Sequence, residues 1–208
     1  MTGSATPRRP PSGAQLRADR TRSLVIDETV RCVREEGFAA ASAKHIAERA
    51  GVTWGVIQYH FGDRNGLLTA VVDKAFDELL EILHQLSGEP STLTIQERTE
   101  QIVTATWRAF SSPCSMAALE ILIGTRTLRD AAGTQYLIDL GASFDRLGAR
   151  IADGLDSPDS SVIGKLVMEA LRGLMVAQLV NPAPIDTTSA RADFVDLVSA
   201  YLAGRGQE

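Results

Sequence analysis

The chain has 208 residues, of which 44% are hydrophobic and 23% are charged, with 21 Lys and Arg against 26 Asp and Glu. These values are ordinary for a folded globular protein, and they exclude collagen-like, fully disordered and disulfide-scaffold classes. No run approaches the ~18 consecutive apolar residues of a membrane-spanning helix, so we expect no membrane partner.

The first segment, residues 1–19, is predicted to be a flexible basic tail. It is rich in Pro, Gly, Ser and Arg and holds almost nothing apolar to bury. Residues 1–15 lack the apolar run of a secretory signal. The cysteines, Cys32 and Cys114, are too few and too far apart for a thiolate metal site. We therefore expect a cytoplasmic protein that needs no metal or other cofactor.

Residues 20–66 are predicted to form a helix-turn-helix domain. A first helix with apolar residues at helical spacing ends at Gly37, and Ser42 and Thr53 are placed to cap two short helices after it. The turn between those helices, residues 50–52, is short. So tight a turn makes the helices cross steeply and lets the second one project outward.

The second of the short helices has two distinct faces. Ile57 and Phe61 are four residues apart and are predicted to point inward, whereas Gly55 and Tyr59 lie on the opposite side. One face of this helix is therefore expected to pack, and the other to be available for a partner.

Charge is distributed unevenly along the chain. Up to Arg64 there are 10 basic and 7 acidic residues, whereas the rest has 11 basic and 19 acidic residues. Such asymmetry suggests a head that faces a polyanion, carried by an acidic body.

Residues 67–208 are predicted to form an all-helical body, so the expected fold class is all-α. No alternating strand pattern is present, and Pro, Gly and Ser clusters such as residues 87–90 break the helices. The expected helices lie near residues 65–86, 93–110, 115–125, 128–154, 160–180 and 188–203.

The last two helices of the body are predicted to bury two faces. Residues 162–180 are apolar nearly all round, with a narrow polar stripe of Lys165, Glu169 and Arg172, and residues 194–202 repeat the theme. One side can fill the core of the subunit and the other can pack on a twin subunit. Candidate residues of this homodimer interface are Val167, Leu171, Leu174, Phe194, Leu197 and Tyr201.

A family resemblance rests on a set of short motifs with a specific spacing. They are Gly37-Phe38, residues 46–52 (Ile-Ala-Glu-Arg-Ala-Gly-Val), residues 53–61 (Thr-Trp-Gly-Val-Ile-Gln-Tyr-His-Phe), Arg64 and Leu67-Leu68. The stretch 21–68 resembles the amino-terminal domain of the tetracycline-repressor (TetR) family of transcriptional regulators. The resemblance implies a homodimer that binds a palindrome in double-stranded DNA and is released by a small-molecule effector.

Carried over position by position, the resemblance implies that the third helix enters the major groove while flanking groups hold the phosphates. Val56 would touch a thymine methyl, and Gln58 or Tyr59 would supply hydrogen bonds to bases. The implied DNA contacts are Ser42, Lys44, Thr53, Trp54, Gly55, Val56, Gln58, Tyr59, His60 and Arg64. Structural roles stay open for several of them: Trp54 could pack on the core of the domain, His60 could close the helix, and Ser42 and Thr53 could only cap.

The resemblance also implies an effector cavity in the helical body. Candidate lining residues are Trp107, Phe110, Met116, Leu119, Ile123, Phe144, Met168 and Met175, for each of which plain core packing is the alternative. Their composition favours a mainly apolar effector, and Arg126 and Gln178 are candidate polar anchors.

Two other classes of function compete with a ligand-responsive repressor. A helical protein-docking adaptor that has lost DNA binding stays open because of Trp54 and Gln58 on the exposed helix. An all-helical enzyme finds little support, since no nucleophile, base and acid occur at a recognisable spacing and no phosphate loop or metal cluster is present in the sequence.

Overall fold

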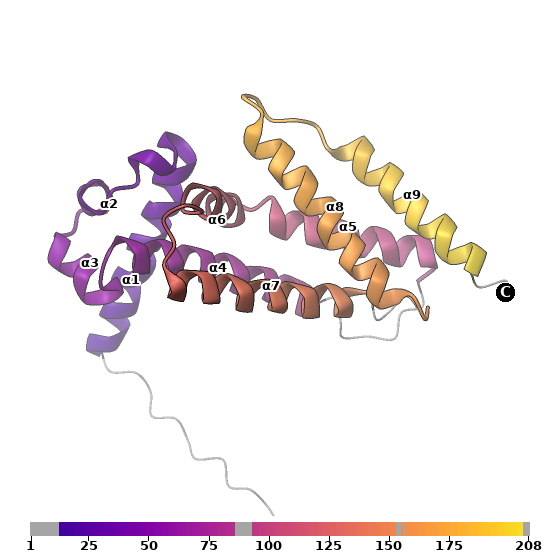
Figure 1. Cartoon of the computed structure of the whole chain (residues 1–208), viewed down its shortest axis with the longest axis horizontal. Coiled ribbons are helices and arrows are strands. Elements are labelled where there is room, and N and C mark those ends of the chain that lie inside the picture. The colour runs from indigo at the N-terminus through magenta and orange to yellow at the C-terminus, as the bar shows by residue number, and fades with distance from the viewer. Residues whose placement is uncertain (1–12, 86–92, 153–154, 156, 206–208) are drawn as a thin grey trace, which may run out of the picture. The chain divides into compact units, whose positions relative to one another are not determined.

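The computed structural model describes residues 13–85, 93–152, 155 and 157–205, and all regular elements in that part of the chain are helices (Figure 1). The expected all-α class is confirmed. Two predicted features, the tail through residue 12 and the break at 87–90, lie outside the described residues. The elements are α1 (Gly13–Glu36), the 3₁₀ turn η1 (Phe38–Ala40), α2 (Ala43–Arg49), α3 (Trp54–Phe61), α4 (Arg64–His84), α5 (Ile95–Phe110), α6 (Pro113–Gly124), α7 (Ala131–Ile151), α8 (Ser160–Val180) and α9 (Thr188–Arg205).

The first helix begins earlier than the sequence pattern predicted. It starts at Gly13, so residues 13–19 of the predicted tail are helical. This stretch contains helix-favouring residues and no proline. Arg17 Nε also donates to the Gly13 carbonyl at 3.1 Å, and Thr21 Oγ1 donates to the Arg17 carbonyl at 3.0 Å. Helix propensity therefore extends the helix beyond its amphipathic part.

Capping residues fix where several body helices begin. Thr94 and Glu97 form a reciprocal capping box at the start of α5. The Ser112 hydroxyl accepts from the Ser115 amide at 3.1 Å, and Pro113 opens α6. The Asp130 carboxylate accepts from the Gly133 amide at 2.8 Å at the start of α7.

The chain divides into two compact units, Met1–Ala70 and Val71–Glu208, and the division falls within α4. In the first unit α1 packs against η1 and α2, and α2 packs against α3. Fully buried Ile46 and Ile57 anchor the two short helices. This packing is what positions the helix-turn-helix.

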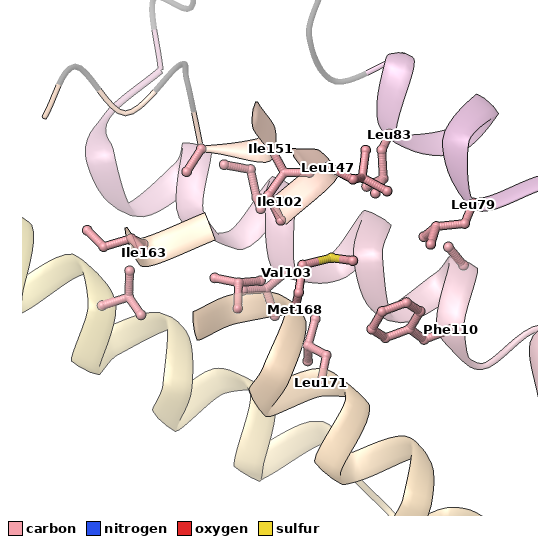
Figure 2. Close-up of a cluster of buried hydrophobic side chains, with 14 of the residues drawn as sticks. Leu79, Leu83, Ile102, Val103, Phe110, Leu147, Ile151, Ile163, Met168 and Leu171 are labelled. Atoms are coloured by element: carbon pink, nitrogen blue, oxygen red, sulfur yellow. The ribbon is translucent and has the colours of Figure 1, made fainter. Parts of the chain in front are cut away.

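The core of the second unit lies among α5, α7, α8 and α9, with the end of α4 joining it (Figure 2). Figure 2 shows Met168 and Leu171 of α8 pointing toward the same cluster as Ile102 and Val103 of α5. Helices α7 and α8 approach closely at Gly148 and Gly164, where a Cβ on Gly164 would collide with the Gly148 carbonyl. The absence of a side chain there lets the helices meet along their length.

In the part of the chain that the structure describes, no helix is both long enough and apolar enough to cross a bilayer.

Candidate functional site

Helix α3 presents one face to the core of its unit and the other outward. Ile57 is fully buried, whereas Tyr59 is 82% exposed and Gln58 is exposed as well. The helix ends at Gly62, whose φ of 79° is left-handed and therefore favours glycine. The inward position predicted for Ile57 and the outward position predicted for Tyr59 agree with this geometry, while Phe61 is only half-buried.

The start of α3 leaves polar and apolar groups accessible. Thr53 occupies the N-cap position, but its hydroxyl makes no capping hydrogen bond, so the expected side-chain cap is not formed. Trp54 is 44% exposed, Gly55 is exposed and Val56 is half-buried. The Trp54 side chain is thus partly exposed and partly covered, a placement that is compatible with either of its two alternative roles.

Helix α2 brings a cation to the same unit. Ser42 caps α2, because its hydroxyl accepts from the His45 amide at 3.2 Å. The Lys44 side chain is 88% exposed, and its Nζ lies 3.9 Å from Glu48 Oε1, a weak surface pair. Lys44 is therefore open to an anionic partner.

Two predicted phosphate contacts have neighbours within the domain. His60 packs edge-on against Tyr59, with ring centroids 4.9 Å apart. Arg64 Nε donates to the Ala41 carbonyl at 2.7 Å, and the guanidinium lies 4.8 Å from the centroid of the Phe38 ring. Burial lowers the pKa of Arg64. These contacts give Arg64 a structural role, and its DNA contact stays a prediction.

A network of ion pairs joins α2 to α1, and sequence reasoning missed it. Arg49 donates to Glu28 and Glu35 at 2.7 Å each and also to Glu36. His45 Nε2 lies 2.9 Å from Glu36 Oε2. The signal available was the acidic side of the first helix, but only the fold shows which cation reaches it.

The second unit contains an apolar cavity of about 230 Å³. Four predicted lining residues, Phe110, Leu119, Phe144 and Met175, do line it. The other four lie elsewhere: Met116 and Met168 are buried in the core, Ile123 is exposed and Trp107 packs beneath Arg191. The cavity is lined by Val72, Ala75, Phe76, Leu79, Phe110, Ser115, Ala118, Leu119, Leu122, Leu137, Leu140, Gly141, Phe144, Arg172 and Met175.

The charged residue on the cavity wall differs from the predicted anchors. Arg126 and Gln178 are absent from the lining, and Arg172 of α8 takes part instead. The sequence places Arg172 on a polar stripe, because the helical period shows that it does not belong to the apolar face. The period does not show which residues of other helices Arg172 faces.

Helices α8 and α9 carry exposed apolar residues, although they are not all the ones predicted. Val167 and Leu171 are buried in the chain's own core, at 1% and 0% exposure, so their side chains offer no surface to a twin. Leu174 and Phe194 are partly buried against the same core. Of the predicted interface residues, Leu197 and Tyr201 are exposed. The exposed apolar residues of the two helices, here called the α8–α9 face, are Val162, Leu166, Val176, Val180, Leu197 and Tyr201.

Comparison with known proteins agrees with this architecture. Residues 25–71 match the family model described as "Bacterial regulatory proteins, tetR family". Over 79 residues the chain is 37% identical to the HTH-type transcriptional regulator BetI of Escherichia coli O45:K1, and this stretch spans 36% of the chain and 40% of that relative.

Two longer similarities extend beyond the first unit. The chain is 26% identical over 197 residues to BetI of Paraburkholderia phytofirmans, which covers 86% of this chain and 93% of that one. The crystal structure of a TetR-family transcriptional regulator from Mesorhizobium loti superposes with a TM-score of 0.65 at 14% identity, covering 90% of this chain and 97% of that one. The structural likeness therefore extends to the helical body.

Proposed function

Since this chain belongs to the tetR family of bacterial regulatory proteins, we propose that it is a ligand-responsive repressor of transcription. It binds a palindromic operator as a homodimer and is released by a small, mainly apolar effector. Its target is double-stranded DNA, so it acts in the bacterial cytoplasm.

The observation that carries this proposal is the outward face of α3. Gln58 and Tyr59 stand exposed on a helix that buried Ile57 fixes in place. A helix held in this way can enter the major groove and place polar side chains against base edges. In this proposal Gln58 and Tyr59 read bases, while Trp54, Gly55 and Val56 form the apolar part of the contact.

The flanks of α3 supply the phosphate contacts. Lys44 offers an exposed ammonium at the start of α2, and the Thr53 hydroxyl is not used for capping. Phosphate contacts fix the register on DNA without reading sequence. Ser42 and His60 are the remaining candidates, and the inward contacts of Arg64 make it the weakest.

The α8–α9 face supports the homodimer. It places six large apolar or aromatic side chains on the surface of α8 and α9. A second copy of the chain that packed on this face would remove these side chains from water. A two-fold dimer would hold two copies of α3 roughly 34–36 Å apart, or a multiple of that, to match successive half-sites of a palindrome.

The cavity of the second unit supports the effector. Its lining is apolar apart from a few polar groups, as in most small-molecule sites. For release, the effector must bind more tightly to the conformation that does not fit the operator than to the conformation that fits it. Bound DNA must then weaken effector binding by the same factor by which the effector weakens DNA binding.

The test begins with a screen of genomic fragments for retention by the purified full chain. For a retained fragment, affinity should fall steeply with salt, since neutralised phosphates release counterions. Lys44→Gln should weaken binding to all fragments, and it should reduce the salt slope, the slope of log affinity against log salt concentration, by about one. Tyr59→Ala should instead change which sequence is preferred.

Arg150→Gln is the matched control for lost charge, because Arg150 is exposed on α7 in the second unit. It should leave affinity and salt slope unchanged. A chain that retains no fragment at low salt would contradict the repressor and favour a protein-docking adaptor.

A further inference from the structure

We propose that the effector is an apolar molecule with a single carboxylate, held by Arg172 at the wall of the cavity while its apolar part fills the interior. This inference rests on the proposed function in that it names the chemical class of that effector.

The interior of the cavity suits a hydrocarbon or aromatic body. Three phenylalanines line it, and their rings contact one another: Phe76 and Phe144 have centroids 5.0 Å apart, and Phe110 and Phe144 are 6.5 Å apart. Aliphatic side chains such as Leu137 and Leu140 of α7 complete the wall. Apolar surface of this kind gains free energy when it covers an apolar ligand in place of water.

Arg172 is the charged residue among those that line the cavity. Its guanidinium carbon lies 5.1 Å from the centroid of the Phe144 ring, so the cation makes a cation–π contact with a residue of the cavity wall. The Ser115 hydroxyl comes from another helix, α6, and is the other polar side chain of the lining. Positive charge at the wall of an otherwise apolar cavity selects against a cationic ligand.

The hydrogen bonds of Arg172 leave one edge of the guanidinium for a ligand. Nη1 donates to both carboxylate oxygens of Glu169, at 3.0 and 3.3 Å. Within the described part of the chain, Nε and Nη2 have no hydrogen-bond partner. Those two nitrogens form the side of the guanidinium that a carboxylate bridges with two parallel hydrogen bonds.

The pair with Glu169 does not satisfy all the hydrogen-bond donors of Arg172 once a ligand is bound. The two side chains are 37% and 61% exposed, so their pair is largely screened by water. A ligand that fills the cavity removes water from the part of Arg172 that lines it. A neutral ligand then leaves donors unpaired at a cost, whereas a carboxylate restores their hydrogen bonds.

The test compares three ligands with the same straight ten-carbon chain: decanoate, 1-decanol and decylamine. Each is titrated by calorimetry into the full chain without DNA, below the concentration at which it aggregates. Decanoate should bind at least about tenfold more tightly than decanol, in keeping with one charge-assisted pair, and decylamine should bind more weakly than decanol.

Two variants of Arg172 separate charge from geometry. Arg172→Gln should reduce decanoate affinity to that of decanol while leaving decanol binding within about twofold of wild type. Arg172→Lys should recover only part of the preference, because lysine has no bidentate edge. Arg150→Gln, on the exposed side of α7, should keep the full preference. Thermal unfolding of each variant checks that it is folded.

Equal affinities for decanoate and decanol, a preference that survives in Arg172→Gln, or no binding of any of the three would overturn the inference. Because these titrations contain no DNA, their outcome is independent of operator binding. A chain that binds decanoate through Arg172 but retains no genomic fragment would refute the repressor and leave the site itself established.

Discussion

Arg49 Nε of α2 donates to Glu28 Oε1 of α1 at 2.7 Å, and Glu28 is only 7% exposed. Arg31 Nη2 approaches the other oxygen of the same carboxylate at 2.7 Å, so Glu28 lies between two guanidinium groups. Helix α2 has 7 residues, too few for a helix that is stable by itself. The orientation of the helix-turn-helix therefore depends on this polar attachment together with buried Ile46.

The same attachment predicts how stability responds to acid. Hydrogen bonds from His45 and Arg49 hold the pKa of Glu36 below its ordinary value. A carboxyl whose pKa is depressed in the folded state adds stability above its unfolded pKa of about 4.3, and this stability is lost as the pH falls through the folded pKa. The Tm of wild type should therefore fall more steeply below about pH 5 than the Tm of Glu36→Gln.

Calorimetric or circular-dichroism melting between neutral pH and acid measures this difference. Asp77→Asn removes an exposed carboxylate of α4 and serves as the control. Parallel curves for wild type and Glu36→Gln would show that the contacts of Glu36 do not contribute.

Gly164→Ala should destabilise the second unit. The new Cβ would meet the Gly148 carbonyl and the Ala152 side chain, so α7 and α8 would have to separate, at a cost of about 1–3 kcal/mol. Gly141→Ala on α7 meets nothing within 4 Å and should be neutral or slightly stabilising. Chemical denaturation of both variants gives the comparison, and equal midpoints would contradict the close approach.

Arg64→Met should lower the thermal stability of the first unit and leave the salt dependence of DNA binding unchanged. It removes the donor to the carbonyl of Ala41, a residue that is fully buried, and an unpaired buried carbonyl costs roughly 1–3 kcal/mol. Thermal melting and the salt slope of operator binding should be measured together. An unchanged Tm with a slope reduced by about one would show that Arg64 is a phosphate contact instead.

Leu166→Glu should convert the proposed homodimer into monomers. Leu166 is 57% exposed on the α8–α9 face, and a carboxylate there would be buried against a twin without a partner. Sedimentation equilibrium should show a lower mass and operator affinity should fall, since one α3 alone contacts only a half-site. Ile138→Glu, at a 59% exposed position of α7, should change neither. A wild-type chain that sediments as a monomer would refute the dimer.

Much of the first unit could be predicted because its information is local. The 3.6-residue period places Ile57 inward and Tyr59 outward, and Gly37, Gly51 and Gly62 stand where left-handed turns separate the helices. The motifs that carry the family resemblance lie in the same stretch, so both the fold class and the family followed from the sequence.

The remaining features depend on contacts between residues far apart in the sequence. Helical period cannot tell Leu171, which fills the chain's own core, from Leu166, which lies on the surface, because α8 is apolar on both sides. It also cannot show that Arg64 turns inward to Ala41 or that Arg172 reaches the cavity wall. The sequence determined most of the helical segments and which face of α3 is exposed, because these follow from neighbours three and four residues apart. Only the tertiary structure decided what each face and each cation meets, because that depends on which helices pack together.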